Sequence, residues 1–293
     1  MPGPRRSGPG QTQMMTLVVA DLEEGGITLV ADTQLTDPRT VTRPNLFNGA
    51  LKIVTLQRGI AVAYAGDHHA AVDAIRSLQV NRESVVGIEE IEQALLREHR
   101  RWNQAFDFIV ASLYPTVRLS AIRDGVLEEP SGGRCWVGDS SGFNHFQAAT
   151  ALNPGAPARQ ILREAMASVI ADSSILHVGG LVVAVYPSRR GFFYSGGVEL
   201  VSDGRQSIPS GIPTDVTWAQ GAATGSFTQV LLTPPDGSGI GAIGLFLREA
   251  NAGALYYPLA SPDPIVIGAT TQSAFVAEVK ARFDIGLSGL ELR

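Results

Sequence analysis

Two short apolar segments, Thr16–Leu22 and Ile27–Ala31, stand near the start of the chain and are joined by Glu23–Gly26. Both segments are rich in β-branched residues, and the glutamates and glycines between them are typical of a turn. The pattern predicts a β-hairpin. A hydroxyl residue, Thr16, begins this hairpin, and a carboxylate, Asp32, directly follows its second strand.

Apolar runs and alternations predict further antiparallel strands along the chain. These strands are expected over residues 51–56, 60–65, 106–113, 117–123, 126–128, 134–137, 176–186 and 191–194. Apolar positions at helical spacing predict helices over residues 67–78, 88–102 and 156–171. Antiparallel strands dominate this order, which favours sheets that carry helices on their outer faces.

Composition changes at both ends of this pattern. Residues 1–15 are polar and rich in Pro, Gly and Gln, and we expect them to form a disordered tail. Residues 16–197 form the main predicted domain. Residues 198–293 are richer in Gly, Pro, Ser and Thr and predict a β-rich carboxy-terminal extension without a chemistry-bearing motif. Its expected elements are strands near 230–233, 242–247, 254–257 and 265–267 and a closing helix over 272–283.

The overall composition fits a globular protein and narrows its partners. Hydrophobic residues make up 44% of the 293 residues and charged residues 17%. The net charge of −5 gives no electrostatic case for nucleic acid or an anionic membrane. No apolar run approaches the roughly 20 residues that span a bilayer. The single cysteine, Cys135, rules out a disulfide framework. We therefore expect a soluble, cytoplasmic protein.

Lysine and histidine give opposite signals about chemistry. Only Lys52 and Lys280 are lysines, and all remaining basic residues apart from the histidines are arginines. An amine shifts its pKa on burial and can release a proton, which a guanidinium cannot, so a retained lysine is expected to be needed as an amine. The histidines show no metal-ligand spacing, so we expect no metal and no cofactor. The pair His68-His69 is expected to be a solvated helix cap.

The chain resembles the proteasome β-subunit family, including its bacterial relatives of the HslV and ancestral-β kind, within the amino-terminal-nucleophile hydrolases. The resemblance lies in TLVVADLEEGGITLVADTQLTD, LKIVTL and IAVAYAGDHHAAVDAI, and it covers about residues 16–195. In that family a catalytic threonine begins the first strand and an aspartate closes the second, as Thr16 and Asp32 do. A lysine then begins the third strand, matched by Lys52, and the glycine of a later Ala-Gly pair is matched by Gly66.

The resemblance implies a fold, a mechanism and an assembly. The fold is a four-layer αββα sandwich, here with the β-rich extension. In the mechanism, Oγ1 of Thr16 attacks a peptide carbonyl and the freed α-amine of Thr16 takes the proton. Lys52 favours the alkoxide, Asp32 orients Lys52, and the N–H of Gly66 receives the oxyanion. The family also implies a homo-oligomeric ring or spiral, a peptide or protein substrate and a possible ATPase partner.

Two later segments of the family have partial counterparts in the chain. A Gly-Ser-Gly turn near the nucleophile resembles Gly138–Gly142, which suggests Ser140 or Ser141 as a member of the site. An Asp-x-x-Ser-Gly-Gly segment is approximated by Asp172 and Ser174, with a glycine pair arriving later. The resemblance implies that Ser140, Asp172 and Ser174 join the catalytic residues.

The residues leave other interpretations open. With residues 1–15 attached, Thr16 has no α-amine, and the chain would be a non-catalytic structural subunit of such an assembly. Catalysis requires either translation from Met15 with removal of that methionine or self-cleavage before Thr16. An amidase of the same fold that acts on small amides would use the same residues.

Gly138–Gly142 also fits the G-x-S-x-G elbow of serine hydrolases, which needs a helix directly after the turn. We expect no helix start at residues 143–146.

Overall fold

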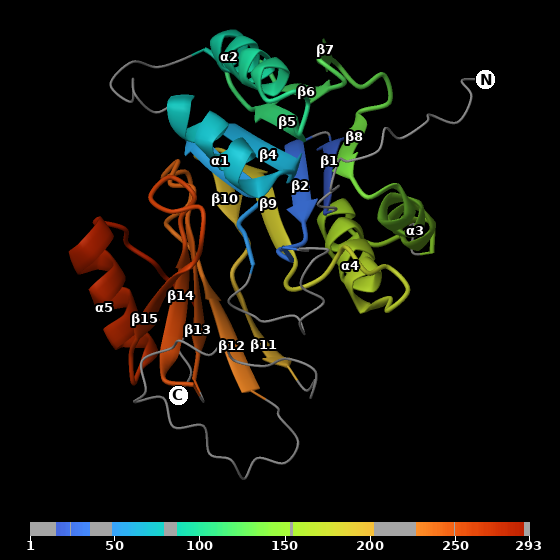
Figure 1. Ribbon diagram of the computed structural model, residues 1–293. Helices are drawn as coiled ribbons and strands as arrows, with labels where there is room; N and C mark the ends of the chain where they lie inside the picture. Colours follow the sequence, from blue (N-terminus) through green and yellow to red (C-terminus); the bar gives the residue numbers. More distant parts are fainter. Residues whose placement is uncertain are drawn as a thin grey trace.

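The computed structural model describes residues 16–23, 25–35, 49–78, 87–152, 155–201, 227–248 and 250–289. The expected tail over residues 1–15 lies outside the described residues. The described strands are β1 (Leu17–Glu23), β2 (Gly26–Ala31), β3 (Ile53–Gln57), β4 (Ile60–Gly66), β5 (Phe106–Ser112), β6 (Arg118–Arg123), β7 (Val126–Glu128), β8 (Arg134–Gly138), β9 (Val183–Ser188), β10 (Gly191–Tyr194), β11 (Gly197–Val201), β12 (Phe227–Leu232), β13 (Ile243–Leu247), β14 (Ala252–Tyr256) and β15 (Ile265–Gly268). The described helices are α1 (His68–Ser77), α2 (Ile88–Arg101), α3 (Ser140–Thr150), α4 (Ala158–Ala171) and α5 (Gln272–Phe283) (Figure 1).

The described strands form three five-stranded sheets. The first has the order β10-β9-β2-β1-β8, the second β3-β4-β5-β6-β7 and the third β11-β12-β13-β14-β15. The predicted hairpin is present, with Val18 opposite Ala31. On its other side β1 pairs with β8, with Leu17 opposite Gly138. The start of β1 therefore lies beside the ends of β2 and β8.

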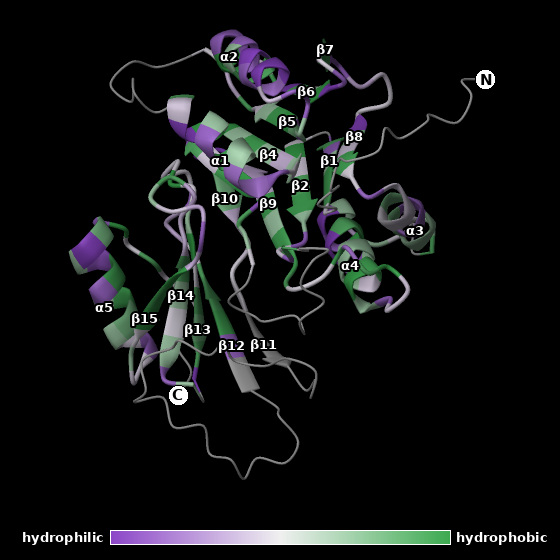
Figure 2. Cartoon of the chain, in the orientation of Figure 1, coloured by the Kyte–Doolittle hydropathy of each residue, from purple (hydrophilic) through white to green (hydrophobic). Residues whose placement is uncertain are grey.

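The first two sheets face each other, and helices cover their outer faces. Small and branched side chains, Val18, Ala20, Ile53, Ala63 and Ile109 among them, form one buried cluster between the sheets. The outer face of the first sheet packs on α3 and α4, and that of the second packs on α1 and α2. Figure 2 shows the hydrophobic residues concentrated on the strands, whereas α2 carries many hydrophilic residues. The fold is thus mixed α/β, with helices outside the sheets as the sequence pattern predicted.

The third sheet packs against the same core. Ile243, Leu245, Ala252 and Ala254 of β13 and β14 belong to the cluster between the first two sheets. The opposite face of the third sheet packs on α5 through Phe275 and other apolar residues. The expected carboxy-terminal strands and closing helix are present as β12–β15 and α5, and β11 is an additional strand that pairs with β12.

The expectation of no helix after Gly138–Gly142 is wrong, because α3 begins at Ser140. The side chain of Asp139 accepts the N–H of Gly142 at 2.7 Å, which satisfies a donor that the helix start would otherwise leave unpaired. Only Gly142, Phe143 and Phe146 of this helix are buried. An apolar stripe this short gives a weak periodic signal, so the capping aspartate was the better indicator.

One expected strand begins later than the sequence pattern predicted. Residues 176–182 are not strand, and β9 starts at Val183. The carbonyl of Gly179 instead accepts the N–H groups of Thr33 at 3.2 Å and Gln34 at 3.0 Å. This irregular segment therefore lies against the residues that follow β2.

Candidate active site

Three of the sequence-predicted residues meet at the start of β1. Thr16 directly precedes β1, Asp32 directly follows β2, and Lys52 directly precedes β3. Nζ of Lys52 donates to Oγ1 of Thr16, and it donates to Oδ1 of Asp32 at 2.8 Å. Oγ1 of Thr16 donates to the same carboxylate oxygen. Elements from both facing sheets thus bring together a hydroxyl, an ammonium and a carboxylate.

Backbone donors hold the carboxylate of Asp32, which is fully buried. Its Oδ1 accepts the N–H of Leu17 at 3.1 Å, and its Oδ2 accepts those of Gln34 and Gly179, both at 3.1 Å. A buried charge is costly unless hydrogen bonds and an opposite charge compensate it. The surrounding backbone supplies this compensation and fixes the orientation of the carboxylate.

Lys52 is 2% exposed, and all three protons of its ammonium have oxygen partners. Besides Thr16 and Asp32, Nζ donates to the carbonyl of Gln34 at 2.6 Å. Burial lowers the pKa of Lys52 because it penalises the charged form, and the charge of Asp32 offsets part of this effect. Lys52 is therefore an amine that gives up its proton more readily than a surface lysine does.

Glycines allow the backbone to come close to Thr16. Gly66 ends β4 at a φ of +109°, and a Cβ at this position would lie 2.5 Å from the carbonyl oxygen of Ala105. Gly138 ends β8 at a φ of +108°, and a Cβ there would lie 1.7 Å from the carbonyl oxygen of Thr16 and 3.3 Å from Cβ of Ala65. The side chain of Ala65 and the carbonyl of Thr16 therefore both lie close to Gly138, whereas Gly66 itself is packed against Ala105 and Phe106.

The sequence analysis missed Asp139 as a site residue. Its N–H donates to the carbonyl of Thr16 at 2.6 Å, which continues the pairing of β1 with β8 by one residue. Asp139 is buried and stands directly opposite Thr16 across the first sheet. Its position as the first residue after a strand that pairs with β1 could have identified it, but that pairing is not visible in the sequence.

Ser140, Asp172 and Ser174 have other surroundings. Ser140 is the exposed first residue of α3. Asp172 follows α4, and its carboxylate accepts the N–H of Ser174 at 2.9 Å and lies 3.1 Å from Nδ1 of His145 on α3. Hydrogen bonds from Ser174 lower the pKa of Asp172. Among the described residues, the hydrogen bonds of Asp172 and Ser174 join α4 to α3 and do not reach Thr16. Their catalytic roles stay predictions.

Comparisons with known proteins find a distant likeness among solved structures. No family model matches the chain, and no curated protein matches it. Among solved structures, the chain is similar to a crystal structure of eukaryotic HslV from Trypanosoma brucei, with 18% sequence identity and a TM-score of 0.43. The match covers 58% of this chain and 98% of the HslV chain. A likeness at this level carries no functional argument, which has to come from the residues of the chain itself.

The structure contains the helix that the serine-hydrolase interpretation requires, but it places no histidine of the described residues as a base for Ser140. The strand, turn and helix that the elbow requires are present as β8, Gly138-Asp139 and α3. However, His145 bonds to Ser168 at 2.9 Å and pairs with Asp172. Among the described residues, no histidine is hydrogen-bonded to Ser140. The elbow geometry therefore comes without the proton acceptor that would activate the serine.

Other candidate chemistries find less support. Cys135 is buried, and burial raises the pKa of its thiol to about 12, which leaves it protonated. Within the described ranges, no group of three or more His, Cys, Asp or Glu side chains is placed to hold a metal ion. The described helices include none that is long and apolar enough to cross a bilayer.

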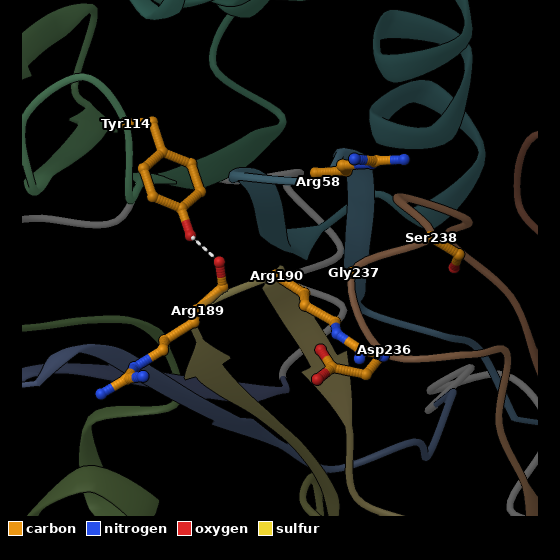
Figure 3. A pocket seen from close by; sticks show the side chains of 7 residues that line it. All are labelled: Arg58, Tyr114, Arg189, Arg190, Asp236, Gly237 and Ser238. Carbon is orange, nitrogen blue, oxygen red and sulfur yellow. Dashed lines mark hydrogen bonds between the residues drawn. The ribbon is translucent and has the colours of Figure 1, made fainter.

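A crevice of about 610 Å³ lies at the opposite end of the sheets, beyond the end of β3 and the end of β9. Its arginine side chains spread apart instead of converging, and Arg190 lies beside Asp236 (Figure 3). The hydroxyl of Tyr114 donates to the carbonyl of Arg189 at 3.0 Å. The hydroxyl of Ser238, which also lines the crevice, accepts the N–H of Ile240 at 3.3 Å. The charges of the crevice do not converge on this hydroxyl, so the cluster around Thr16 is the candidate active site.

Proposed function

We propose that the chain is a threonine-type peptidase subunit of a proteasome-like, self-compartmentalising assembly. One observation carries the proposal: the buried hydroxyl of Thr16 is hydrogen-bonded to both Lys52 and Asp32. The two facing sheets with helices on their outer faces support a four-layer αββα sandwich of the amino-terminal-nucleophile type. In this proposal residues 16–197 form the hydrolase domain and residues 198–293 its carboxy-terminal extension.

The proposed reaction proceeds through an ester on Thr16. Oγ1 of Thr16 attacks the peptide carbonyl while the α-amine of Thr16 takes the hydroxyl proton. The positive charge of Lys52 stabilises the developing alkoxide, and Asp32 holds Lys52 in place. The N–H of Gly66 is the proposed oxyanion donor, a contribution worth about 3 kcal/mol in other hydrolases. The proton then passes to the leaving amine, and water hydrolyses the ester to regenerate Thr16.

Asp139 is the proposed positioning residue for the nucleophile. Its N–H fixes the carbonyl of Thr16, and its side chain fixes the first turn of α3. Together these bonds hold the backbone of Thr16 from the side opposite to Asp32. The hydroxyl is thereby presented to the substrate by two strands of the first sheet.

The proposal requires Thr16 to be the first residue of the active chain. The test is intact-mass measurement after reaction with a peptide epoxyketone, which bonds to the hydroxyl and the α-amine of the same terminal residue. The expected product is one adduct on a chain that begins at Thr16, and no adduct on Thr16→Ala. Peptide turnover by a chain that retains its leading residues would overturn the mechanism. An unreactive chain that keeps these residues would favour the structural-subunit alternative.

The same proposal extends to assembly and substrate. We expect a homo-oligomeric ring or spiral in the cytoplasm, with a possible ATPase partner. Mass photometry of the purified protein checks the oligomer, and a monomer at micromolar concentration would contradict it. Turnover of peptides compared with small acyl amides separates the peptidase from the amidase alternative. Preference for small amides by at least tenfold in kcat/KM would reassign the substrate class.

A further inference from the structure

The segment that carries Lys52 is held by Tyr64 on the neighbouring strand β4. The N–H of Tyr64 donates to the carbonyl of Lys52 at 3.1 Å, and its hydroxyl lies 3.2 Å from the carbonyl oxygen of Leu51. Tyr64 is 1% exposed, and Leu51 is buried too. Because Leu51 and Lys52 precede β3, these contacts decide where the ammonium of Lys52 enters the site.

His68 on α1 connects Tyr64 to a distant part of the chain. Its Nδ1 lies 2.7 Å from the hydroxyl of Tyr64, and its Nε2 lies 2.7 Å from the carbonyl oxygen of Pro262. A carbonyl only accepts hydrogen bonds, so Nε2 carries a proton, and in the neutral ring Nδ1 accepts from Tyr64. His68 is 2% exposed. The expectation that His68-His69 is a solvated cap is therefore wrong for His68, while His69 is exposed.

Pro262 belongs to the connection between β14 and β15 of the third sheet, and this connection is anchored on α1. The guanidinium of Arg76 donates to the carbonyl of Ala260, and the side chain of Leu259 packs on the cluster around Tyr64. The segment just before β13 also approaches β3 directly, since a Cβ on Gly241 would lie 2.5 Å from the side chain of Val54. The carboxy-terminal sheet thus contacts the Lys52 segment through a turn and through close packing.

We propose that His68 is a positioning residue for Lys52, through which the carboxy-terminal sheet sets the place of the ammonium beside Thr16. The path runs from Pro262 through His68 to the hydroxyl of Tyr64, and from the N–H of Tyr64 to the carbonyl of Lys52. Because the single hydroxyl proton of Tyr64 goes to His68, the approach of this hydroxyl to the carbonyl oxygen of Leu51 is a close contact and not a second hydrogen bond. In this role the extension is a working part of the site and not an appendage. The catalytic consequence rests on the proposed peptidase function, but the placement of Lys52 does not.

The chain offers an independent readout, because Lys52 and Lys280 are its only lysines. Labelling lysine with carbon-13 at Cε gives two NMR signals in the full-length protein. Lys280 is an exposed internal reference that pairs with Asp284. The titratable groups that face Lys52 and its relay are Asp32, Tyr64, His68, His69 and Asp263. The titration of the second signal therefore reports the surroundings of the Lys52 ammonium without any assay of activity.

The test compares His68→Phe and Tyr64→Phe with His69→Phe as the matched control. Loosening the segment admits water, and because burial is the main cause of the lowered pKa of Lys52, that pKa should rise in the first two variants. His68→Gln keeps a hydrogen-bond donor toward Pro262, so the pKa of Lys52 in this variant should stay close to its wild-type value. The double variant should shift the pKa no further than either single variant does, because both break one path.

Activity supplies a second, separate comparison. Misplacing a catalytic group by about 1 Å can cost roughly 100-fold, so kcat should fall by that order in His68→Phe and Tyr64→Phe while KM changes little. An unshifted Lys52 signal in both variants overturns the positioning role, whatever the activity. A shifted signal in a protein that turns over no peptide supports the positioning role and refutes the peptidase proposal instead.

Discussion

Lys52 is a buried charged residue at the centre of the candidate active site. Its ammonium is surrounded by the hydroxyl of Thr16, the carboxylate of Asp32 and the carbonyl of Gln34. In the proposed mechanism this ammonium stabilises the alkoxide by its charge, from a buried place in which three oxygen atoms hold it. A guanidinium is always protonated and needs a wider space for its planar group.

Lys52→Arg should therefore inactivate the protein although it keeps the charge. We expect kcat to fall by at least about 100-fold, because the larger guanidinium cannot take the place of the ammonium beside Thr16 and a displacement of about 1 Å costs this much. Lys280→Arg is the matched control, because Lys280 is exposed and pairs with Asp284 on the same surface. Steady-state peptide turnover by the two variants checks this, and near-wild-type turnover by Lys52→Arg would reject the role.

His68 gives the protein a defined sensitivity to acid. Burial lowers its pKa from 6.5 to about 4 in the folded protein. The unfolded chain therefore binds the proton first, and the stability that the neutral ring contributes is fully present above pH 6.5. It is lost as the pH falls through the window down to about 4, to the extent of roughly 3 kcal/mol.

His68→Gln should remove this part of the acid destabilisation. Urea unfolding at pH 7 and pH 4.5 should show a smaller stability difference for His68→Gln than for the wild type. His69→Gln should keep most of the wild-type difference, because burial, and not the neighbouring His69, is the main cause of the lowered pKa of His68. Equal pH dependence in the wild type and His68→Gln would show that His68 is not a buried neutral ring.

At the scale of elements, the joint between β8 and α3 is the least tolerant part of the site. Gly138 lies so close to β1 that a side chain would meet the carbonyl of Thr16. Asp139 follows at once and bonds both to Thr16 and to the first turn of α3. A change at this joint should therefore displace the proposed nucleophile and the helix start together.

Gly138→Ala should abolish activity and destabilise the fold by more than about 3 kcal/mol, a size that indicates a steric clash. The control is Gly132→Ala on the turn before β8, where a Cβ would meet nothing within 4 Å. Thermal unfolding and peptide turnover of both variants check the prediction. If Gly138→Ala were as stable as the wild type, β1 and β8 could move apart enough to accept a Cβ at this position, which would contradict the prediction.

The sequence predicts those elements and residues that depend on segments close to one another along the chain. The hairpin β1-β2 follows from a local apolar pattern, and Thr16, Asp32 and Lys52 are identified by a resemblance whose motifs lie on strands that are neighbours in sequence. Asp139 acts through a backbone bond across the sheet to β1, and His68 acts through a turn that arrives almost at the end of the chain. Neither contact produces a periodic pattern or a motif in the sequence. The sequence therefore predicts Thr16, Asp32 and Lys52 but not Asp139 and His68, which are proposed to position them.

On the scale of the whole molecule, one buried hydroxyl joins the edges of the first two sheets. Tyr194 on β10 donates to the carbonyl of Ile53 at 2.8 Å and accepts the N–H of Thr55 at 3.1 Å, both on β3. These backbone groups lie on an edge strand of the second sheet, and no strand of the described residues pairs with that side. A side chain of the first sheet therefore completes the second one, close to Lys52.

Tyr194→Phe should destabilise the fold by about 1–3 kcal/mol, because it leaves buried backbone groups unpaired. Tyr114→Phe is the control: its hydroxyl also bonds to carbonyls, but the side chain is 48% exposed and water can replace it. Urea unfolding of the two variants gives the comparison. Equal losses would indicate that water reaches the edge of β3.

Among the described residues, every polar contact of Thr16 is made by atoms that follow its nitrogen: the hydroxyl contacts Lys52 and Asp32, and the carbonyl contacts Asp139. Cutting the peptide bond on the amino side of Thr16 leaves all of these contacts in place. Trimming would then yield a terminal residue whose hydroxyl and carbonyl already have their partners.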